Sequence, residues 1–293
     1  MATASPPVSV LISVLNGASW LREAIDSVLA QSFADFELLV VDNASHDETP
    51  AILAGYHDPR LVVVRNEATL SLAASLNRGL SLARAPLVAR LDADDIAKPE
   101  RLARQQAAMA AAPDLVLLGT WWDDLWDGPA PRIEPGPATA TAHEALLDAL
   151  AGGNPIAHPS VMLRREAALA AGGYPEDFAY AQDYALWLRL AQTCRIGVLP
   201  ERLVVIRHHP GQLSTVQSWS GTRLEDVIRL HRQALTLPGL SERGRAAGRW
   251  ALAAACYRLA GLRLREHAPT AAAALVLRGL ATAPVATLRR ALS

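Results

Sequence analysis

Short apolar runs alternate with helical segments throughout the first 91 residues, and this alternation limits the fold more than any other feature. Four runs have the length and β-branched content of buried strands, and three segments between them have apolar residues at helical spacing. The predicted strands cover residues 8–15, 36–41, 61–64 and 87–91, and the predicted helices cover residues 20–31, 46–55 and 70–83. Strands that alternate with helices form parallel sheets covered on both faces, so the sequence predicts an α/β fold.

Carboxylates follow two of these strands at their carboxyl ends. Asp42 follows the second strand, and Asp92, Asp94 and Asp95 follow the fourth. Right-handed crossovers bring these strand ends to one edge, where α/β sheets bind their ligands. Carboxylates this close repel one another, and Mg²⁺ or Mn²⁺ would relieve the repulsion while also binding substrate phosphates. The alternative is that the acids stabilise the N-terminus of the helix predicted over residues 99–111.

A general base and a further metal ligand have candidates later in the chain. Asp183 lies in the first turn of a helix predicted over residues 182–192, with Tyr184 and Trp187 beside it. Apolar surroundings raise the pKa of a carboxyl group, which can then accept a proton from an attacking hydroxyl. The alternative is a plain N-terminal helix acid. His209 follows an extended segment and is either a metal ligand or an ordinary surface or core histidine.

Charge divides the chain unevenly, although the formal net charge is only −1. Residues 1–218 contain 16 basic and 25 acidic residues, whereas residues 219–293 contain 12 Arg and 4 acidic residues. An acidic body followed by a basic tail indicates two regions with different roles. Residues 119–140 are rich in Trp, Asp, Pro and Gly and are predicted to be an irregular excursion. No nucleic-acid partner is expected.

The basic tail has two interpretations that the sequence leaves open. Its arginines accompany Trp and Leu residues, a pattern that suits a helix lying on an anionic membrane surface. The alternative is a helical cap that packs on the α/β body and exposes its arginines to solvent. The expected location is the cytoplasm, with peripheral contact to the inner face of the cell membrane under the first interpretation. Cys194 and Cys256 have no metal or redox spacing, and the N-terminus resembles no signal peptide.

An ordered set of motifs resembles the family 2 glycosyltransferases. The resemblance covers roughly residues 8–214 and includes Asp92-Ala93-Asp94, Gln182-Asp183-Tyr184 and Arg207-His208-His209-Pro210. The remaining similar segments are residues 8–16, 27–32, 37–49, 76–79, 101–105, 158–162 and 172–174. Each motif is short, but their order along the chain is that of the family.

The resemblance implies a GT-A type nucleotide-binding sheet with helices on both faces and a C-terminal helical extension. The glycosyltransferase domain would be residues 1–218, with a nucleotide-binding half at about 1–118 and an acceptor half at about 119–218. The helical region rich in Arg, Ala and Leu would be residues 219–293. The activity implied is an inverting, metal-dependent transfer of a sugar from a nucleotide sugar, with a UDP-sugar as the expected donor. The expected acceptor is a saccharide or a lipid-linked saccharide in bacterial polysaccharide or glycolipid assembly.

The resemblance also implies roles for individual residues. The general base would be Asp183, and the acceptor contacts would be His158 and Trp187. The ligands of Mn²⁺ or Mg²⁺ would be Asp92, Asp94 and His209. The contacts to the donor nucleotide would be Asn16, Asp42, Asn43, Asn77, Arg90, Asp92 and Arg207.

The chain departs from the family pattern at two places. Ser13-Val14-Leu15-Asn16 ends the first strand where the family often has Pro-Thr-Tyr-Asn, which changes the nucleoside contacts expected there. Gln182 stands where the family has an acid, so we expect Asp183 to be less perturbed. The Gln-x-x-Arg-Trp motif and transmembrane helices of processive synthases are not evident, which favours a single-addition enzyme. The alternatives are a non-catalytic nucleotide-sugar binding module and an aspartate-dependent phosphatase.

Overall fold

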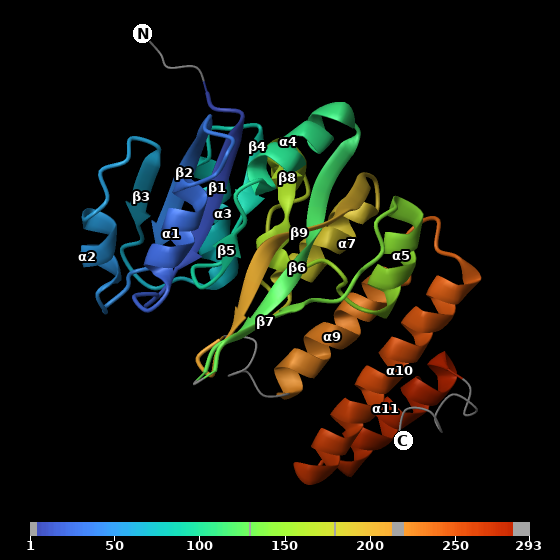
Figure 1. Ribbon diagram of the computed structural model, residues 1–293. Coiled ribbons are helices and arrows are strands. Elements are labelled where there is room, and N and C mark those ends of the chain that lie inside the picture. Colours follow the sequence, from blue (N-terminus) through green and yellow to red (C-terminus); the bar gives the residue numbers. More distant parts are fainter. Residues whose placement is uncertain (1–4, 129, 179, 213–219, 284–293) are drawn as a thin grey trace.

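A computed structural model describes residues 5–128, 130–178, 180–212 and 220–283 (Figure 1). The strands are β1 (Val8–Val14), β2 (Phe36–Asp42), β3 (Leu61–Arg65), β4 (Leu87–Arg90), β5 (Ile96–Ala97), β6 (Leu115–Trp126), β7 (Arg132–Pro135), β8 (Met162–Arg164) and β9 (Arg195–His208). The helices are α1 (Leu21–Leu29), α2 (Thr49–Ala54), α3 (Leu72–Leu82), α4 (Arg101–Ala111), α5 (His143–Gly152), α6 (Arg165–Ala170), α7 (Gln182–Ala191), α9 (Gly221–Ala234), α10 (Glu242–Arg265) and α11 (Pro269–Thr282). A short 3₁₀ helix, η1, covers His158–Ser160.

The first four strands form the parallel sheet that the alternating pattern predicts. Their order is β3-β2-β1-β4, and β1 pairs in parallel with both β2 and β4. Side chains of β1 point alternately to two cores: Leu11 packs in the core that includes α3, and Ile12 in the core that includes α1 and α4. Strands buried on both faces read as continuous apolar runs, which made β1, β2 and β4 recognisable in the sequence. β3 is also an apolar run, although it lies at the edge of the sheet and its Val62 and Val63 are exposed.

The second half of the sheet corrects one prediction. The segment 119–140, expected to be irregular, contains most of β6 and all of β7, which pair with each other antiparallel. β6 also pairs in parallel with β9 along almost its whole length, with irregular register near Trp121. The acids in β6 are compatible with a strand because they have partners: Asp123 accepts from Lys98 Nζ at 2.6 Å, and Asp124 contacts His208 Nε2 at 2.8 Å.

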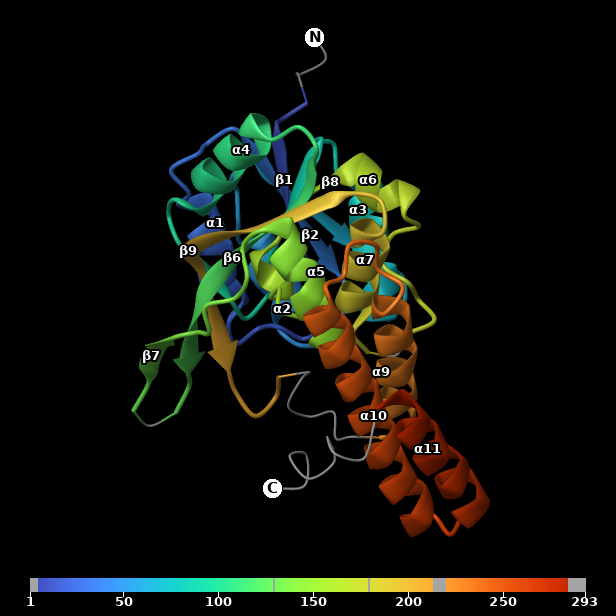
Figure 2. The ribbon, with the colours of Figure 1, turned by 90° about the vertical axis from the view of Figure 1, so that its right-hand side faces the viewer.

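The C-terminal helices first pack on the α/β body and then extend away from it. Gly244 and Gly248 let the first half of α10 approach α5, because an added Cβ would lie 2.1 Å from Asp148 Oδ1 and 3.2 Å from Ala151 Cβ respectively. α9 packs against α5 and α7, as a helical cap would. α11 packs on α10, and the two helices extend away from the sheet (Figure 2). Within the described residues, no helix is long and apolar enough to cross a membrane.

Two helical glycines differ in the space around them, and this gives a stability prediction. An added Cβ at Gly79 in α3 would lie 2.3 Å from Cδ1 of Leu11, which is buried in β1. We expect Gly79→Ala to lower the free energy of unfolding by about 1–2 kcal/mol, because overpacking outweighs the gain in helix propensity. Gly261→Ala in α10 meets no atom within 4 Å. It should raise the free energy of unfolding by about 0.5–1 kcal/mol. Urea unfolding measures both, and equal effects would contradict the packing argument.

Candidate active site

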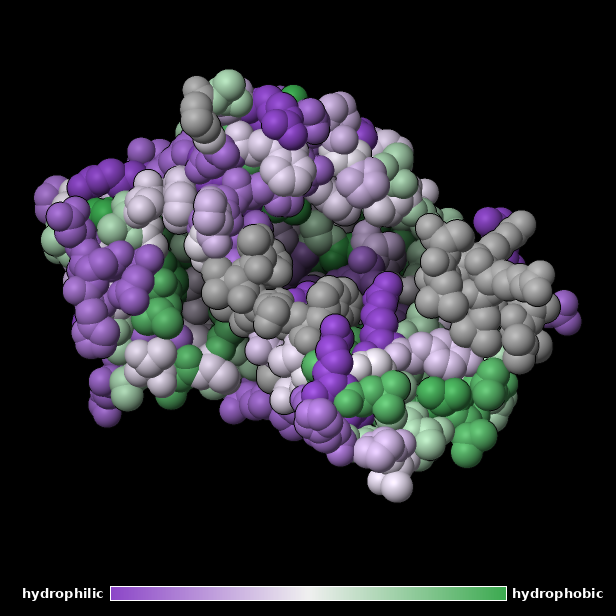
Figure 3. Space-filling view, turned by 90° about the horizontal axis from the view of Figure 1, so that it is seen from below, coloured by the Kyte–Doolittle hydropathy of each residue, from purple (hydrophilic) through white to green (hydrophobic). Residues whose placement is uncertain are grey.

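The carboxyl ends of the parallel strands lie on one side of the molecule. The strands run downward in Figure 1, and the face seen from below is hollowed near its centre (Figure 3). Asn16 and Ala44 follow β1 and β2 with φ of 54° and 60°, a left-handed conformation that non-glycine residues seldom adopt. Such residues cluster at functional sites, and here they turn the chain sharply where both strands end.

Asn16, Asp42 and Asn43 bind the loops at these strand ends. Asn16 Oδ1 accepts from the backbone N–H of His46 at 2.8 Å. Asp42, almost fully buried, accepts from Arg65 Nη1 at 2.7 Å. Asn43 Oδ1 accepts from Leu70 N at 2.9 Å and from the amide of a second asparagine, Asn66, at 2.7 Å. The expected nucleoside contacts are therefore close together, and their side chains also shape the loops that would surround a base.

Three carboxylates crowd the loop after β4. Asp95 is buried, and its pKa is raised well above the ordinary value by burial and by the charges of Asp92 and Asp94. Burial and Asp92 likewise raise the pKa of Asp94. Burial opposes ionisation of Asp92 as well, but the charge of Arg90 and a hydrogen bond from it lower its pKa overall. The loop thus holds more negative charge than its neighbours neutralise.

The end of β9, although distant in the sequence, contacts this loop. His209 Nε2 lies 3.0 Å from Asp94 Oδ2, and the ring of Trp20 lies 3.9 Å from the His209 ring. Arg207 donates from its backbone N–H to Asp95 Oδ1 at 2.9 Å and from Nε to the Asp94 carbonyl at 3.0 Å. The predicted ligands Asp94 and His209 are therefore neighbours, although 115 positions separate them.

Arg207 has ion pairs that orient it. Its guanidinium pairs with Glu23 of α1 and, at 2.8 Å, with Asp127 after β6. Trp20 Nε1 also donates to Asp127, at 3.1 Å. These contacts join α1, β6 and β9 around the acidic loop, so Arg207 positions the loop as well as carrying charge beside it.

The site fits a divalent cation in chemistry but presents an incomplete set of ligands. Among the residues that the structure describes, no three His, Cys, Asp or Glu side chains converge as a group that could hold a metal. Asp94 and His209 supply one oxygen and one nitrogen, whereas Asp92 is turned to Arg90. A Mg²⁺ ion commonly takes only one or two carboxylates and completes its shell with substrate phosphates and water. The residues present fit such an arrangement.

Two buried polar side chains hold together the strands next to the loop after β4. Neither of them was assigned a role from the sequence. Arg101 Nη2 donates to the Arg90 carbonyl at 2.6 Å and to the Val161 carbonyl at 3.2 Å. Gln105 Nε2 donates to the Leu118 and Ser160 carbonyls at 2.7 and 2.9 Å. Burial, together with the charge of Arg90, lowers the pKa of Arg101 to about 9. The sequence offered only the motif at residues 101–105, because arginine and glutamine on a helix usually face solvent.

Asp183 lies in the first turn of α7. Ala181, which precedes the helix, has φ of 58°, so the chain turns sharply just before this residue. Burial raises the pKa of Asp183 to about 6; backbone hydrogen bonds oppose the shift and the Asp92 charge adds to it. The pKa is thus raised even though position 182 carries the uncharged Gln182, because burial is the largest cause of the shift.

Asn154 is a further site residue that the sequence did not reveal. Its Nδ2 donates to Asp183 Oδ2 at 2.8 Å, and its Oδ1 accepts from the Ile156 backbone N–H at 3.1 Å. The second bond fixes the orientation of the amide, so the donating group faces Asp183. An Asn-Pro step was the only signal in the sequence, and it indicates a turn rather than a contact.

His158, Tyr174 and Trp187 form an aromatic group beside Asp183. His158 Nε2 lies 3.0 Å from the Tyr174 hydroxyl, and the ring of Trp187 lies 6.0 Å from that of His158. Burial and the nearby Arg90 lower the pKa of His158 to about 3, so its ring is neutral. Trp187 is completely buried, which does not fit the acceptor contact expected for it; it supports the other two rings.

Asn77 also differs from its expected role. Its amide accepts from Tyr174 N and donates to the Tyr174 carbonyl, both at 2.8 Å. The same amide donates to Glu176 Oε1 at 3.1 Å. These three bonds occupy the side chain, so Asn77 holds the loop that carries Tyr174 rather than facing the strand ends that bear Asp42 and Asp94.

Comparison with known sequences decides the family. The model of glycosyl transferase family 2 matches residues 9–172. The chain belongs to this family. The glycosyltransferase activity expected from the motifs is confirmed, and the phosphatase and non-catalytic alternatives are set aside.

The similarity to curated relatives of this glycosyltransferase extends beyond the segment that the family model matches. The amylovoran biosynthesis glycosyltransferase AmsE of Erwinia amylovora is 29% identical over 234 residues, which is 78% of this chain and 86% of AmsE. An uncharacterized glycosyltransferase of Haemophilus influenzae is 26% identical over 254 residues, 79% of this chain and 74% of the relative.

Solved structures share the fold of this glycosyltransferase. S. aureus TarS 1-349 in complex with UDP-GlcNAc superposes with a TM-score of 0.70 and 19% identity, over 96% of this chain and 82% of that chain. The mannosyltransferase PcManGT from Pyrobaculum calidifontis, in complex with GDP-Man and Mn²⁺, gives 0.58 and 20% over 99% and 88%. At these identities the likeness concerns the fold alone, and it confirms the predicted GT-A type.

The raised pKa of Asp183 predicts a pH-dependent cost in stability. The folded-state pKa is about 6 and the ordinary value 3.8, so ionisation penalises the folded state increasingly between these values and fully above them. We expect Asp183→Asn to raise the free energy of unfolding by about 1–2 kcal/mol at pH 8, after allowing for solvent screening at a partly exposed site. The gain should be much smaller at pH 4.

Chemical denaturation at the two pH values measures this difference. Asp35→Asn, at an exposed position, is the matched control and should change stability little at either pH. If Asp183→Asn gave the same change at pH 4 and pH 8, Asp183 would not ionise with the raised pKa.

Proposed function

We propose that this glycosyltransferase moves a sugar from a nucleoside diphosphate sugar to an acceptor hydroxyl, with inversion and with the help of a divalent cation. The observation that carries the proposal is Asp183, a carboxyl group with a pKa of about 6 whose titration is affected by Asp92 of the acidic loop. A base and a diphosphate-binding loop thus share one site. An acceptor between them would have a proton acceptor on one side and the leaving group on the other.

The donor half of the proposal rests on the strand ends. Asp42 and Asn43, with the loop around Asn16, would contact the base and ribose of the nucleotide. A UDP-sugar is our proposed donor, and the UDP-GlcNAc complex of the similar TarS structure supports the class. Arg90 is buried and next to Asp92, where it would offset negative charge close to the diphosphate.

Asp94 and His209 would hold Mn²⁺ or Mg²⁺, with Asp92 available to exchange its Arg90 partner for the ion or the ribose. When bound, such an ion offsets the charge that develops on the leaving diphosphate. The Mn²⁺ in the similar mannosyltransferase structure supports this choice. The chain's own part is to hold the two ligands 3.0 Å apart, with Trp20 against the imidazole.

Asp183 would accept the proton of the attacking hydroxyl. A base with a pKa near the working pH combines a substantial ionised fraction with adequate basicity. Asn154 donates to Asp183 Oδ2, and the acceptor hydroxyl would approach the other oxygen, Oδ1. His158 is neutral and bonded to the Tyr174 hydroxyl, so it would contact the sugar or the acceptor through hydrogen bonds and ring surface rather than as a cation.

The acceptor would be a hydroxyl of a saccharide or lipid-linked saccharide in the assembly of a bacterial polysaccharide or glycolipid. The amylovoran biosynthesis role in the name of AmsE supports this context. We place the reaction in the cytoplasm, and the free thiols of Cys194 and Cys256 are in keeping with a reducing compartment. The domain limits of 1–218 and 219–293 remain part of the proposal.

The metal assignment predicts a selective loss of nucleotide binding. Asp94→Ala should weaken the binding of UDP measured with Mn²⁺ at least tenfold, because it removes the carboxylate that would hold the ion, and should leave metal-free binding unchanged. His209→Ala should have a smaller effect of the same kind. Isothermal titration calorimetry with UDP and with GDP measures these affinities. Asp35→Ala is the control at an exposed acid. Unchanged Mn²⁺-dependent affinity in Asp94→Ala would rule out this metal ligand.

The base assignment predicts a loss of turnover without a loss of donor binding. Asp183→Asn cannot take a proton, so the rate of transfer should fall by about 10²–10⁴-fold while donor affinity stays within a few-fold. Wild-type transfer should rise with pH through about 6, as Asp183 ionises. Asn154→Ala should move this rise to higher pH, because it removes a hydrogen bond to the charged carboxylate. Steady-state rates across pH test both, and near-normal turnover in Asp183→Asn would place the base elsewhere.

A further inference from the structure

The outward face of α11 is mostly apolar. The face toward α10 carries small residues, with Ala272 and Gly279 buried and the Gly279 position packed closely against the Tyr257 ring. At helical spacing, the opposite face consists of Thr270, Ala273, Ala274, Leu277, Ala281 and one charged residue, Arg278, with Leu280 at its edge. Leu277 is 67% exposed. A helix on the surface of a soluble domain normally has the reverse arrangement, with its larger apolar residues turned inward.

Exposed apolar residues lie on α11 and at the end of α10. We define the apolar patch as Leu264, Val276, Leu277 and Leu280, all of which are exposed. Figure 3 shows a hydrophobic area over the C-terminal helices, with strongly hydrophilic side chains next to it. An exposed apolar area bordered by polar residues commonly marks a site of protein or membrane contact.

The charge around the patch selects between these partners. Residues 219–293 contain 12 Arg and 4 acidic residues, and two of the acids, Glu225 and Glu266, are both paired with Arg263. α11 has no acidic residue, and its Arg278 is exposed. A second copy of this surface would meet like charge, whereas an anionic lipid surface would meet opposite charge.

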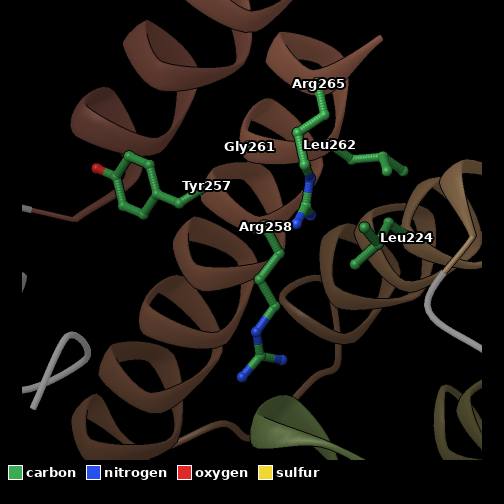
Figure 4. Close-up of a pocket in the computed structure, with 6 residues that line it drawn as sticks. All are labelled: Leu224, Tyr257, Arg258, Gly261, Leu262 and Arg265. Atoms are coloured by element: carbon green, nitrogen blue, oxygen red, sulfur yellow. The ribbon is translucent and has the colours of Figure 1, made fainter.

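A hollow between α9 and α10 adds a place for an anionic amphiphile. It has a volume of about 560 Å³ and is lined by Leu224, Tyr257, Arg258, Gly261, Leu262 and Arg265. Arg265 and Leu262 extend from α10 toward Leu224, whereas Arg258 extends along α10 away from it and Tyr257 points to the opposite side (Figure 4). The Arg265 guanidinium beside leucine side chains matches a lipid phosphate and the start of its acyl chain in chemistry.

Figure 3 shows the hollow near the centre of the face and the hydrophobic area over the C-terminal helices in one view from below.

We propose that the apolar patch binds the surface of an anionic lipid membrane, with Arg265 and Arg278 at the lipid phosphates. The helices would lie at the interface without crossing it, as amphipathic surface helices do. This inference concerns a surface outside the candidate active site and does not depend on the proposed donor, metal or base.

Co-sedimentation with vesicles tests the proposal without any activity measurement. The full chain should bind vesicles of phosphatidylcholine mixed with phosphatidylglycerol at low salt, and bind less at high salt. Leu277→Ser with Leu280→Ser should reduce the partition coefficient at least tenfold, because it removes apolar surface that enters the interface. Arg265→Gln with Arg278→Gln should reduce it by about 25-fold at low salt, at about fivefold for each arginine.

Matched controls keep the test specific. Val63→Ser with Leu82→Ser changes two exposed apolar residues on the body, and Arg195→Gln changes an exposed arginine there; both variants should bind vesicles as the wild type does. Donor affinity should be equal in all variants. The proposal is overturned if the wild type does not bind anionic vesicles, or if it binds neutral ones equally. It is also overturned if the Leu277 and Leu280 variant binds normally, or if the patch instead mediates a dimer that this variant abolishes.

Discussion

The excess negative charge after β4 is the constraint on which the rest of the site depends. Asp92, Asp94 and Asp95 repel one another in a partly buried loop, and the fold supplies cations from distant segments to hold them. Arg90 comes from the strand itself and Arg207 from the end of β9. Arg101 bonds to the Arg90 carbonyl from below. The long pairing of β6 with β9 positions Arg207 beside the acidic loop.

The candidate site combines unfavourable local choices that a purely structural loop would avoid. A carboxyl group with a raised pKa at Asp183 and left-handed backbone at Asn16, Ala44 and Ala181 each reduce stability. Among the described residues, three of the four non-glycine residues with positive φ lie at the strand ends or at the start of α7, and the fourth, His267, lies between α10 and α11. Backbone strain often accompanies function, which supports the choice of this region as the site.

The sequence predicted the elements that have a regular apolar pattern and the charged residues that interrupt such a pattern. The four parallel strands were visible because both faces of each are apolar, and Asp94 because it ends such a strand. β6 and β7 were missed because a half-exposed strand with Trp and Asp, followed by Pro and Gly, has the composition of a loop. Arg101 and Asn154 act through bonds to partners far along the chain, and no local spacing encodes such partners. The burial of Trp187 on a helix with apolar neighbours on several sides could be established only from the packing.

The Asn77 contact ties two distant segments of the domain together in a way that matters for engineering. Asn77 belongs to α3, which packs against β1 and β2, yet its amide holds the backbone of Tyr174, whose hydroxyl bonds to His158. Gly173 beside it has φ of 67°, and an added Cβ there would lie 2.5 Å from Asn77 Oδ1. A chimaera that takes residue 77 from one protein and residue 173 from another therefore needs asparagine at the first position and glycine at the second. Without both, Tyr174 and the His158 ring bonded to it would lose the support of α3.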